Sequence, residues 1–345
     1  MIDYLLDTHF GEYDPPMPSP ALAQERLAVL LDEARRCDRV GFDGVLVPDR
    51  HGRTETVAPA PLSLLAVLAR ETERVELGTF SLVLTLYPPM LVAEEAVFAD
   101  LLSGGRVKLS VSMGYHDAYF RQMGVPAKQR VSRFEESVEI LQRAFEGERF
   151  SYHGRRFDLD DVLLTPPPVR PGGIPLWFGG ESPEMITRTA LHADGWATGQ
   201  GPLDRDHWLR RVESYRKQAS DAGRPSHVVM MRDGFVASTL EEAFAIAGEG
   251  LIGEQVFCFS QNATRNKFFP EPFRSASDFT IENVKDHLVV GSPDDCIESA
   301  NRYFDDYDVD ELVLRFRFPK GPSAAAVADC IDRFGEEVLP HVKRK

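Results

Sequence analysis

Short apolar segments alternate with longer segments of helical periodicity along this chain of 345 residues. Apolar runs without polar alternation are typical of buried parallel strands, and a period near 3.6 is typical of amphipathic helices. The predicted strands cover residues 4–6, 45–47, 75–84, 107–112, 175–180, 196–198, 228–237 and 311–316. The predicted helices cover residues 21–39, 61–70, 91–102, 132–146, 183–192, 204–221, 239–249 and 324–338. This strict alternation predicts an α/β fold, a closed parallel (β/α)8 barrel, with an open doubly wound sheet as the alternative.

Two insertions interrupt the alternation. Residues 147–173 are too rich in Pro, Gly and Asp for an ordinary connection, and residues 253–287 hold six Phe among polar residues. Long excursions from compact domains are usually functional or disordered. The aromatic content of 253–287 favours an ordered lid or wall over the barrel mouth, and packing between subunits is the alternative interpretation.

Composition and charge are consistent with one domain over residues 1–345. The chain is 43% hydrophobic and 27% charged, and a barrel of this size is commonly a single domain. The net charge of −15 argues against a nucleic-acid partner. The basic segment RRVESYRK at 210–217 is interpreted as the solvated face of a helix.

The cysteines and the N-terminus point to a reducing compartment. Four cysteines, Cys37, Cys258, Cys296 and Cys330, lie far apart without metal-ligand spacing. The N-terminal MIDYLLDTHF carries acids in place of a basic leader, and no apolar run reaches the roughly 18 residues of a membrane helix. We expect a cytoplasmic, soluble chain without a membrane partner.

Histidines follow several of the predicted strands. The active site of a barrel lies at the carboxyl ends of its strands. His9 follows the first strand, Arg50 and His51 follow the second, and His116 follows the fourth. One histidine is more often structural than catalytic, but three at one mouth form a candidate centre for general acid–base chemistry.

The segment WFGGESPEM at 177–185 joins a buried strand to a helix start. Gly179 and Gly180 end the strand, and Ser182 followed by Pro183 is a typical helix N-terminus. Backbone N–H groups at such a turn suit an anion, often a phosphate. An ordinary βα turn is the alternative.

Motifs for other chemistries were not found. The chain lacks HxH, HExxH and CxxC spacings, so we expect no metal site. It also lacks a GxSxG nucleophile elbow and the GxGxxG dinucleotide fingerprint. A phosphate turn without that fingerprint favours a mononucleotide or another phosphorylated cofactor.

Several longer segments resemble one family. They are GFDGVLVPD at 41–49, LSGGRVKLSVSMGY at 102–115, GVP at 124–126, RFEESVEILQRAFEGE at 133–148, TPPPVRPGGIPLWFGGESPEMITRTALHADGWA at 165–197, RDGFVASTLEEA at 232–243 and the ending FGEEVLPH. In this order they resemble the bacterial luciferase-like, flavin-dependent monooxygenase family, and the block at 165–197 is the most specific.

The resemblance implies a fold, a cofactor and partners. Members of the family are TIM barrels, usually dimeric, with an insertion near the seventh strand. One branch uses reduced FMN and O2, with the flavin supplied by a separate reductase. Another branch uses the deazaflavin coenzyme F420 for hydride transfer without O2. The expected substrate is a small, hydrophobic or aromatic organic molecule.

The resemblance also assigns cofactor-binding residues. Glu181 and Ser182 match the positions that hold the flavin phosphate, and Met185 matches a further phosphate contact, here through its backbone alone. Phe80 and Ser81 match the place of an unusual cis peptide beneath the flavin ring.

Three residues in the glycine turns complete the expected cofactor site. Met113, after the fourth strand, replaces the arginine that luciferases place against the phosphate. Gly114 follows it, and Gly180 belongs to the turn after the fifth strand. A positive charge near the phosphate must therefore come from elsewhere, or the N–H groups must suffice.

The expected catalytic residues are His51, His116, Arg50 and His9. After the second strand luciferases have two adjacent histidines, and this chain has Arg50 and His51. His51 or His116 is expected to manage a proton, and Arg50 to stabilise a developing anion. Beside the FMN-dependent monooxygenase, the alternatives are an F420-dependent oxidoreductase and a non-catalytic flavin-binding protein.

Overall fold

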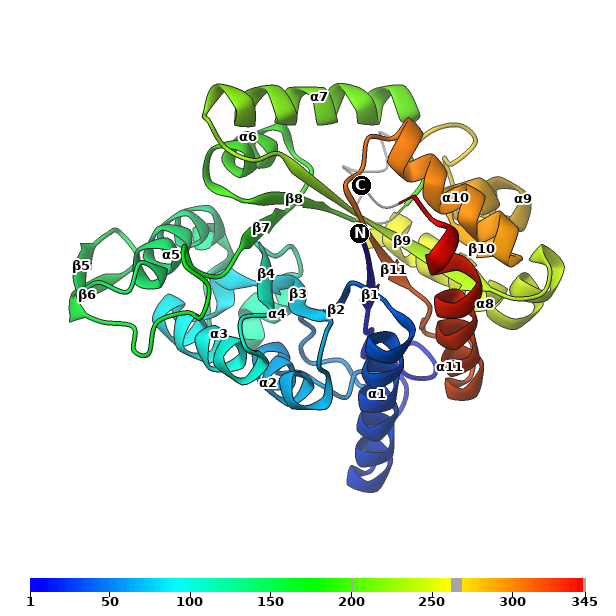
Figure 1. Ribbon diagram of the computed structural model, residues 1–345, viewed down its shortest axis with the longest axis horizontal. Helices are drawn as coiled ribbons and strands as arrows, with labels where there is room; N and C mark the ends of the chain where they lie inside the picture. Colours follow the sequence, from blue (N-terminus) through cyan, green and yellow to red (C-terminus); the bar gives the residue numbers. More distant parts are fainter. Residues whose placement is uncertain (200, 262–268, 344–345) are drawn as a thin grey trace.

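Eight parallel strands form a closed barrel in a computed structural model that describes residues 1–199, 201–261 and 269–343 (Figure 1). The strands are β1 (Ile2–Leu5), β2 (Gly44–Val47), β3 (Glu76–Val83), β4 (Val107–Ser112), β7 (Leu176–Gly179), β8 (Gly195–Thr198), β9 (His227–Val236) and β11 (Glu311–Arg315). They neighbour one another in chain order, and pairing of β1 with β11 and of β8 with β9 closes the sheet. The prediction of a (β/α)8 barrel is confirmed, and the open sheet is excluded.

Helices surround the strands and cover their outer faces (Figure 1). The helices are α1 (Pro20–Val40), α2 (Pro61–Glu71), α3 (Pro89–Ser103), α4 (Asp117–Gln122), α5 (Arg130–Phe145), α6 (Pro183–His192), α7 (Arg205–Asp221), α8 (Leu240–Gln261), α9 (Ile281–Val284), α10 (Pro293–Asp306) and α11 (Ala324–Arg333). Side-chain oxygens of Ser19, Ser182 and Ser323 cap α1, α6 and α11. Such caps satisfy backbone donors that the first helical turn leaves without partners.

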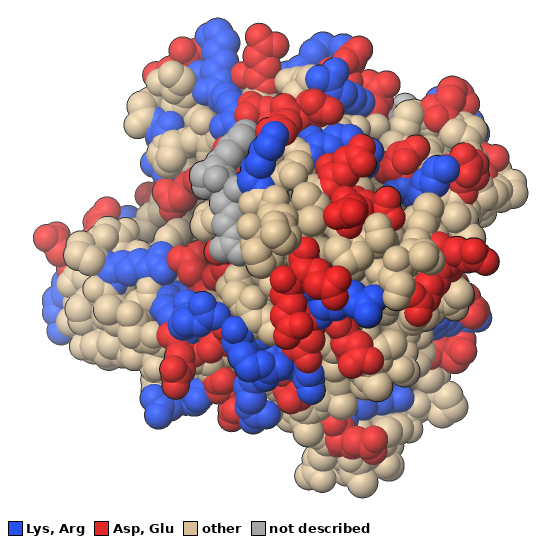
Figure 2. All heavy atoms as spheres, turned by 45° about the vertical axis from the view of Figure 1, so that its right-hand side comes forward, with Lys and Arg blue, Asp and Glu red and all other residues tan. Residues whose placement is uncertain are grey.

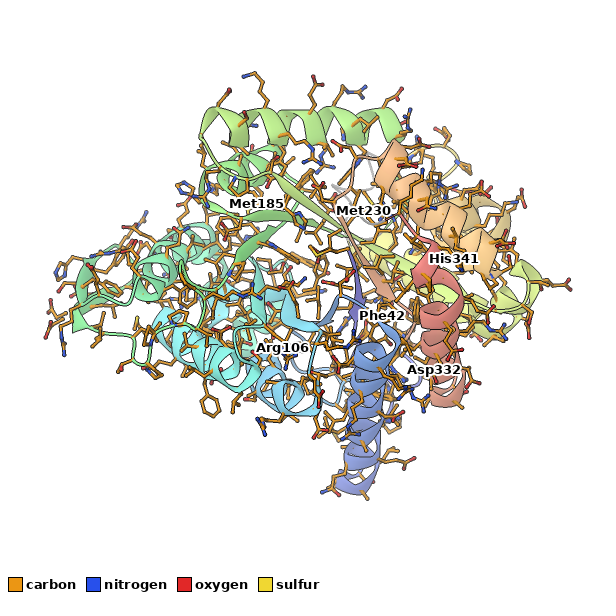
Figure 3. All side chains as sticks on the ribbon, in the orientation of Figure 1. Phe42, Arg106, Met185, Met230, Asp332 and His341 are labelled. Atoms are coloured by element: carbon orange, nitrogen blue, oxygen red, sulfur yellow. The ribbon has the colours of Figure 1, made fainter. Side chains whose placement is uncertain are left out.

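Side chains fill the space between the strands and the helices (Figure 3). Phe42, before β2, packs against Phe334 with ring centroids 5.8 Å apart. Asp332 on α11 pairs with Arg36 and Arg39 of α1, which joins the last helix to the first.

The inside of the barrel has an apolar layer between two ionic layers. On β1, Asp3 and Leu5 share the inner side because successive strand residues alternate in direction, and Asp7 follows two residues after the strand ends. Leu5 packs in a small apolar cluster inside the barrel. At the amino ends of the strands, Lys108 Nζ lies 2.7 Å from Asp3 Oδ2 and 2.8 Å from Glu311 Oε1. Asp7 belongs to a second ionic group at the carboxyl ends.

The insertion at 147–173 contains a two-stranded antiparallel hairpin. Its strands are β5 (Phe150–His153) and β6 (Asp158–Val162). The Glu136 carboxylate on α5 accepts hydrogen bonds from the backbone N–H groups of Arg155, Arg156 and Phe157. The hairpin is therefore held against α5 and projects away from the barrel (Figure 1).

The insertion at 253–287 is more helical than predicted. The helix expected over 239–249 continues to Gln261 as part of α8, so residues 253–261 of this insertion are helix. After residues 262–268, short helical turns and α9 lead to β10 (Val289–Gly291), which pairs with β9. The following helix α10 was missing from the sequence prediction.

Several phenylalanines of this insertion contact one another. Phe273 and Phe279 are buried with ring centroids 4.9 Å apart, and Phe259 lies 5.3 Å from Phe279. Phe257 contacts the mouth, whereas Phe268 lies outside the described residues. Within the described parts of this insertion, Phe269, Phe273 and Phe279 belong to the main hydrophobic core, and Phe259 packs against it. The interpretation of the insertion as a lid or wall over the barrel mouth stays a prediction.

The interpretation of segment 210–217 as a solvated face is wrong for half of its residues. Val212 and Tyr215 on α7 are buried. Arg216 pairs with Asp308 and Asp310, and Arg211 turns toward the loop after β7. Because α7 packs on the barrel, one of its sides is apolar and its basic residues meet acidic partners.

The surface charges, the cysteines and the helix lengths bear on the remaining general features of the chain. Basic and acidic side chains are intermixed on the face drawn in Figure 2. The four cysteines form no disulfide within the described chain. None of the helices in the described ranges is long and apolar enough to span a bilayer.

Candidate active site

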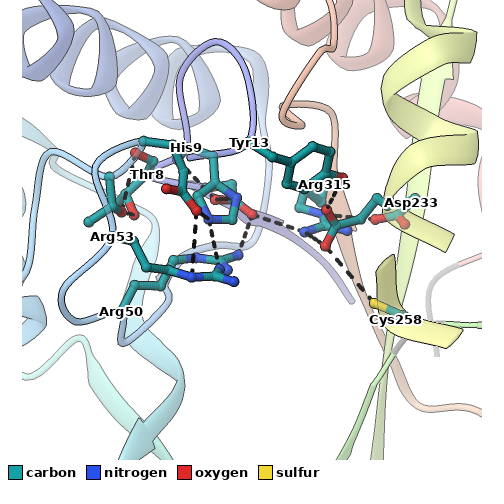
Figure 4. A network of polar contacts seen from close by, with 12 residues as sticks. Thr8, His9, Tyr13, Arg50, Arg53, Asp233, Cys258 and Arg315 are labelled. Atoms are coloured by element: carbon teal, nitrogen blue, oxygen red, sulfur yellow. Dashed lines mark hydrogen bonds and ion pairs between the residues drawn. The ribbon is translucent and has the colours of Figure 1, made fainter. Parts of the chain in front are cut away.

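Polar side chains from β1, β9, β11 and α8 meet at the carboxyl end of the barrel (Figure 4). The Arg315 Nε atom lies 2.8 Å from Asp233 Oδ1, and its Nη1 atom lies 3.0 Å from both Asp7 Oδ2 and Glu254 Oε1. Burial would lower the pKa of Arg315, but these three carboxylates raise it well above its usual value. The guanidinium therefore stays charged and connects Asp7, Asp233 and Glu254 at the carboxyl end of the barrel.

Arg50 and His9 extend this network toward β2. Arg50 Nη2 donates to Asp7 Oδ2 at 2.7 Å. His9 is 1% exposed, and its Nε2 atom lies 3.2 Å from Arg53 Nη1. Burial and the nearby Arg50 lower the pKa of His9 to about 3, so its ring is neutral at physiological pH. The structure places His9 inside the network, away from bulk solvent.

His51 is held by a carboxylate and a phenol. Its Nε2 atom lies 2.8 Å from Asp49 Oδ1 and 2.9 Å from the Tyr87 hydroxyl. Asp49 also accepts a hydrogen bond from the backbone N–H of Val83 at 2.9 Å. Asp49 and Tyr87 thus fix the orientation of the imidazole.

His116 reaches the same region through an aromatic neighbour. The Tyr119 ring lies 5.3 Å from His51 and 5.1 Å from His116, measured between centroids. Burial, Arg53 and Arg50 lower the pKa of His116 to about 4. The structure therefore gathers His9, His51 and His116 around one mouth, as predicted, although only His116 is partly open to solvent.

The middle of β3 has an unusual backbone and close contacts with the strands beside it. The peptide between Phe80 and Ser81 is cis, which confirms the expectation from the family resemblance. Ser81 Oγ lies 2.7 Å from Ser110 Oγ of β4. A Cβ at Gly179 would come within 2.7 Å of Ser81 Oγ, so a larger residue there would displace the Ser81 hydroxyl.

The turn from β7 to α6 has the predicted strand, glycine and helix start. Gly180 has φ +143°, and a Cβ there would come within 2.9 Å of Met185 Cγ. Ser182 Oγ accepts the Met185 N–H at 3.2 Å, and the Met185 side chain is buried. Since Ser182 already caps Met185, the donors open to a bound anion belong to other residues of the first turn.

Arg211 brings a positive charge to the turn between β7 and α6. From α7 it donates through Nη2 to the backbone carbonyl of Glu181 and through Nη1 to Glu181 Oε2 at 3.5 Å. Glu181 Oε1 accepts the Gly199 N–H at 3.2 Å. Its signal in the sequence was position: Arg211 is three residues after buried Trp208 and four before buried Tyr215, on the inner side of α7.

The turn after β4 is tightly packed. Gly114 has φ +74°, and a Cβ there would come within 2.4 Å of Val83 Cγ1. The Met113 carbonyl accepts the Thr85 hydroxyl at 2.9 Å. Because β3, β4 and β7 are adjacent strands, Ser81, Gly114 and Gly180 lie along one side of the mouth.

The described residues contain no cluster of three or more His, Cys, Asp or Glu side chains suited to a metal ion.

Arg315, Asp7 and Glu254 were not among the predicted site residues. They are far apart in sequence, so only the closed barrel brings them together.

A closed parallel barrel with ionisable side chains gathered at the carboxyl ends of its strands has the architecture of a barrel enzyme. A family model described as luciferase-like monooxygenase matches residues 6–308. The chain therefore belongs to the luciferase-like monooxygenase family.

Curated relatives include proteins of both branches. An oxygenase component named flavin-dependent trigonelline monooxygenase, from Acinetobacter baylyi, is 21% identical over 90% of this chain and 88% of its own length. An F420-dependent glucose-6-phosphate dehydrogenase from Amycolatopsis mediterranei is 26% identical over 91% of this chain and 94% of its own length. A Mycobacterium bovis protein named only as uncharacterized is 35% identical, but the match covers 50% of this chain and 59% of that relative.

Solved structures share the fold at low identity. The monooxygenase RslO1 from Streptomyces bottropensis superposes with a TM-score of 0.79 at 21% identity, over 99% of each chain. The oxygenating constituent of 3,6-diketocamphane monooxygenase from Pseudomonas putida, solved with FMN, gives 0.76 at 18% identity, over 98% of this chain and 99% of that chain. At this identity the likeness extends to the fold alone.

Proposed function

We propose that this chain is the oxygenase component of a two-component, FMN-dependent monooxygenase. The observation that carries the proposal is the turn from Gly180 to Met185, where a capped helix start lies beside Arg211. Backbone donors and a cation together suit the phosphate of a mononucleotide. The trigonelline monooxygenase is similar to this chain over most of the length of both proteins, and its name describes it as an oxygenase component.

The residues present suit a flavin mononucleotide. At Phe80 and Ser81, β3 contacts both neighbouring elements of this side: Ser81 Oγ lies 2.7 Å from Ser110 Oγ of β4, and Phe80 packs against the apolar cluster that contains Trp177 of β7. Gly180 has a positive φ that lets its backbone turn toward a ligand. We infer that the β7–α6 turn holds the phosphate, and that the backbone from Phe80 to Ser81 supports the ring system.

When bound, reduced FMN would supply the electrons for activating O2, and that chemistry belongs to the cofactor. The protein would bind it, orient the substrate and exclude water. His51, held by Asp49 and Tyr87, is the residue we propose to move a proton at its Nε2 atom. His116 is a second candidate for that role.

Arg50 would stabilise negative charge developing on the substrate. Its guanidinium bonds to Asp7 through one nitrogen. Burial would lower the pKa of Arg50, but the carboxylates of Asp7 and Glu254 raise it, so the group remains a cation throughout turnover. His9 would position Arg53 through their contact instead of exchanging a proton with solvent.

A coenzyme F420-dependent oxidoreductase is the second candidate function. Met113 offers no positive charge where luciferases place an arginine, and the F420-dependent glucose-6-phosphate dehydrogenase is also similar over most of this chain. This enzyme would transfer hydride without consuming O2.

A flavin reductase is the partner that the proposed function requires, because the oxygenase takes its flavin in reduced form.

We also propose a homodimer that uses α2 and α3. Leu91, Phe98 and Leu101 lie on one side of α3 and are 43%, 58% and 42% exposed, and Val67 on the neighbouring α2 is 44% exposed. Such a stripe is unusual on a monomer surface. Phe98→Glu should shift the mass measured by light scattering from dimer to monomer, whereas a dimeric variant would exclude this face.

The test of the proposed oxygenase is the fate of O2. The chain, FMN, NADH and a flavin reductase are incubated with heavy-isotope O2 and a panel of small organic substrates. Transfer of one labelled oxygen atom to a substrate, dependent on both chain and reductase, is the expected result. Labelled oxygen in none of the substrates, together with hydride transfer from reduced F420, would select the second candidate.

A further inference from the structure

Two guanidinium groups at the mouth, Arg50 and Arg53, have hydrogen-bond donors that the protein does not fully use. Their neighbour Arg315 differs, because Asp233, Asp7 and Glu254 surround it at 2.8–3.0 Å. A guanidinium carries five N–H donors in a planar fork. The contrast indicates that Arg315 is structural, whereas Arg50 and Arg53 can bind a ligand.

Within residues 1–199, 201–261 and 269–343, the short polar contact of Arg50 runs from Nη2 to Asp7 Oδ2 at 2.7 Å. The Arg50 Nε atom is buried, and no acceptor for it was found in the part of the chain that the structure describes. A buried donor without an acceptor costs stability and calls for an explanation. A ligand acceptor at the mouth would provide one.

Arg53 is held loosely. Its Nε atom lies 3.5 Å from Glu55 Oε1, beyond the usual length of a strong charged hydrogen bond. Its Nη1 atom lies 3.2 Å from His9 Nε2. Since burial lowers the pKa of His9 to about 3, that ring contributes no charge at neutral pH. The Arg53 charge is thus only partly compensated by its described neighbours.

Aromatic rings flank the two guanidinium groups. The Arg53 guanidinium carbon lies 5.3 Å from the centroid of Phe257, which stacks on Tyr13 at 5.5 Å. The Tyr115 side chain is 64% exposed, and its ring centroid lies 4.1 Å from that of His116. Both arginines are near enough to lower the pKa of His116, after the larger effect of burial. Planar apolar surfaces therefore border a positive centre.

We propose that the substrate is a planar, aromatic organic acid whose carboxylate is bound by Arg50 and Arg53. This inference rests on the proposed function and names the substrate class for it. A carboxylate matches the guanidinium fork and can accept from both groups at once. The rings of Tyr115 and Phe257 would contact the faces or edges of the substrate ring.

The test uses benzoate and benzamide, which share a shape and differ in charge. Binding of each to the full chain is measured by calorimetry, with and without FMN. We expect benzoate to bind at least about tenfold more tightly, as one charged hydrogen-bonded pair would give. The Arg53→Gln variant should lose this preference, and Arg53→Lys should keep part of it. Arg149→Gln, on the exposed hairpin, is the matched control and should keep all of it.

Three outcomes would overturn the proposal: equal binding of the two probes, binding of neither, or a preference for benzoate that survives in Arg53→Gln. Soluble, folded Arg53→Lys keeps the experiment decisive if Arg53→Gln fails to fold. Anaerobic titration with reduced FMN separates this proposal from the proposed function. A chain that binds reduced FMN without preferring benzoate rejects only the substrate class, whereas a chain that prefers benzoate but binds no reduced FMN rejects the monooxygenase.

Discussion

Arg211 on α7 donates to both the backbone carbonyl and the carboxylate of Glu181, and so joins α7 to the turn between β7 and α6. The Arg211 side chain is 15% exposed, and its guanidinium lies 5.6 Å from the centroid of the Trp196 ring. The turn that we assign to the cofactor phosphate is therefore fixed from outside the barrel.

Replacing Arg211 should weaken binding of the phosphorylated flavin selectively. In Arg211→Met the turn loses its cation and its brace, so we expect the Kd for FMN to rise about tenfold, the effect of one charge-assisted hydrogen bond. The Kd for riboflavin, which lacks the phosphate, should change less than about twofold. Fluorescence titration measures both. Exposed Arg210→Gln is the control, and equal losses for the two flavins would contradict the assignment.

His51 should be required for turnover and dispensable for flavin binding. Its Nε2 atom lies between the Asp49 carboxylate and the Tyr87 hydroxyl. For His51→Ala we expect kcat to fall about 10²-fold or more, the usual effect of losing a general acid or base. The assay uses a substrate found in the labelled-oxygen experiment, and His153→Gln on the exposed hairpin is the control. Full turnover by His51→Ala would remove His51 from the mechanism.

His116 should make the folded protein less stable as the pH falls. Its pKa is about 4 in the folded chain, against 6.5 for an ordinary histidine, because burial and two arginines oppose its charge. Between these pH values the unfolded chain binds more protons, so protonation favours unfolding. We expect His116→Gln to lose less stability than the wild type between pH 7 and about pH 4.5, measured by urea unfolding. Identical losses would show that His116 titrates normally.

Lys108 should stabilise the ionic layer at the amino ends of the barrel strands. It is 2% exposed, lies within 3.1 Å of carboxylates of Asp3, Glu76 and Glu311, and sits 4.5 Å from the Trp177 centroid. Lys108→Met would leave buried acids without a cation, which typically costs about 3–5 kcal/mol of unfolding free energy. Exposed Lys217→Met should cost less than about 1 kcal/mol. Similar urea midpoints for the two variants would argue against this role.

The barrel was predictable because its strands are apolar without alternation and its helices repeat at 3.6 residues. The helix α10 was missed although it begins with Ser292 and Asp295, a capping box, and has Cys296, Ala300 and Tyr303 at helical spacing. The helix was missed because the whole region between the predicted helix at 239–249 and the predicted strand at 311–316 was interpreted as an insertion and a connection. The continuation of α8 was missed because the Phe residues after Gly253 were interpreted as a loop wall.

The candidate site was predictable in part. Local signals identified the Gly180 turn, the cap at Ser182 and the histidines after the strands. The partners of these residues depend on strand register and helix packing. Arg315 Nη1 lies 3.0 Å from Asp7 Oδ2 although the two residues are 308 positions apart, and no local pattern in either segment predicts the pair.

The measurement that tests the central claim most directly is anaerobic titration of the full chain with reduced FMN and, in parallel, reduced F420, followed by mixing with oxygenated buffer. We predict that reduced FMN binds more tightly than reduced F420 and that the loaded chain consumes O2. Binding of reduced F420 alone, without O2 consumption, would contradict the account and identify a hydride-transferring enzyme.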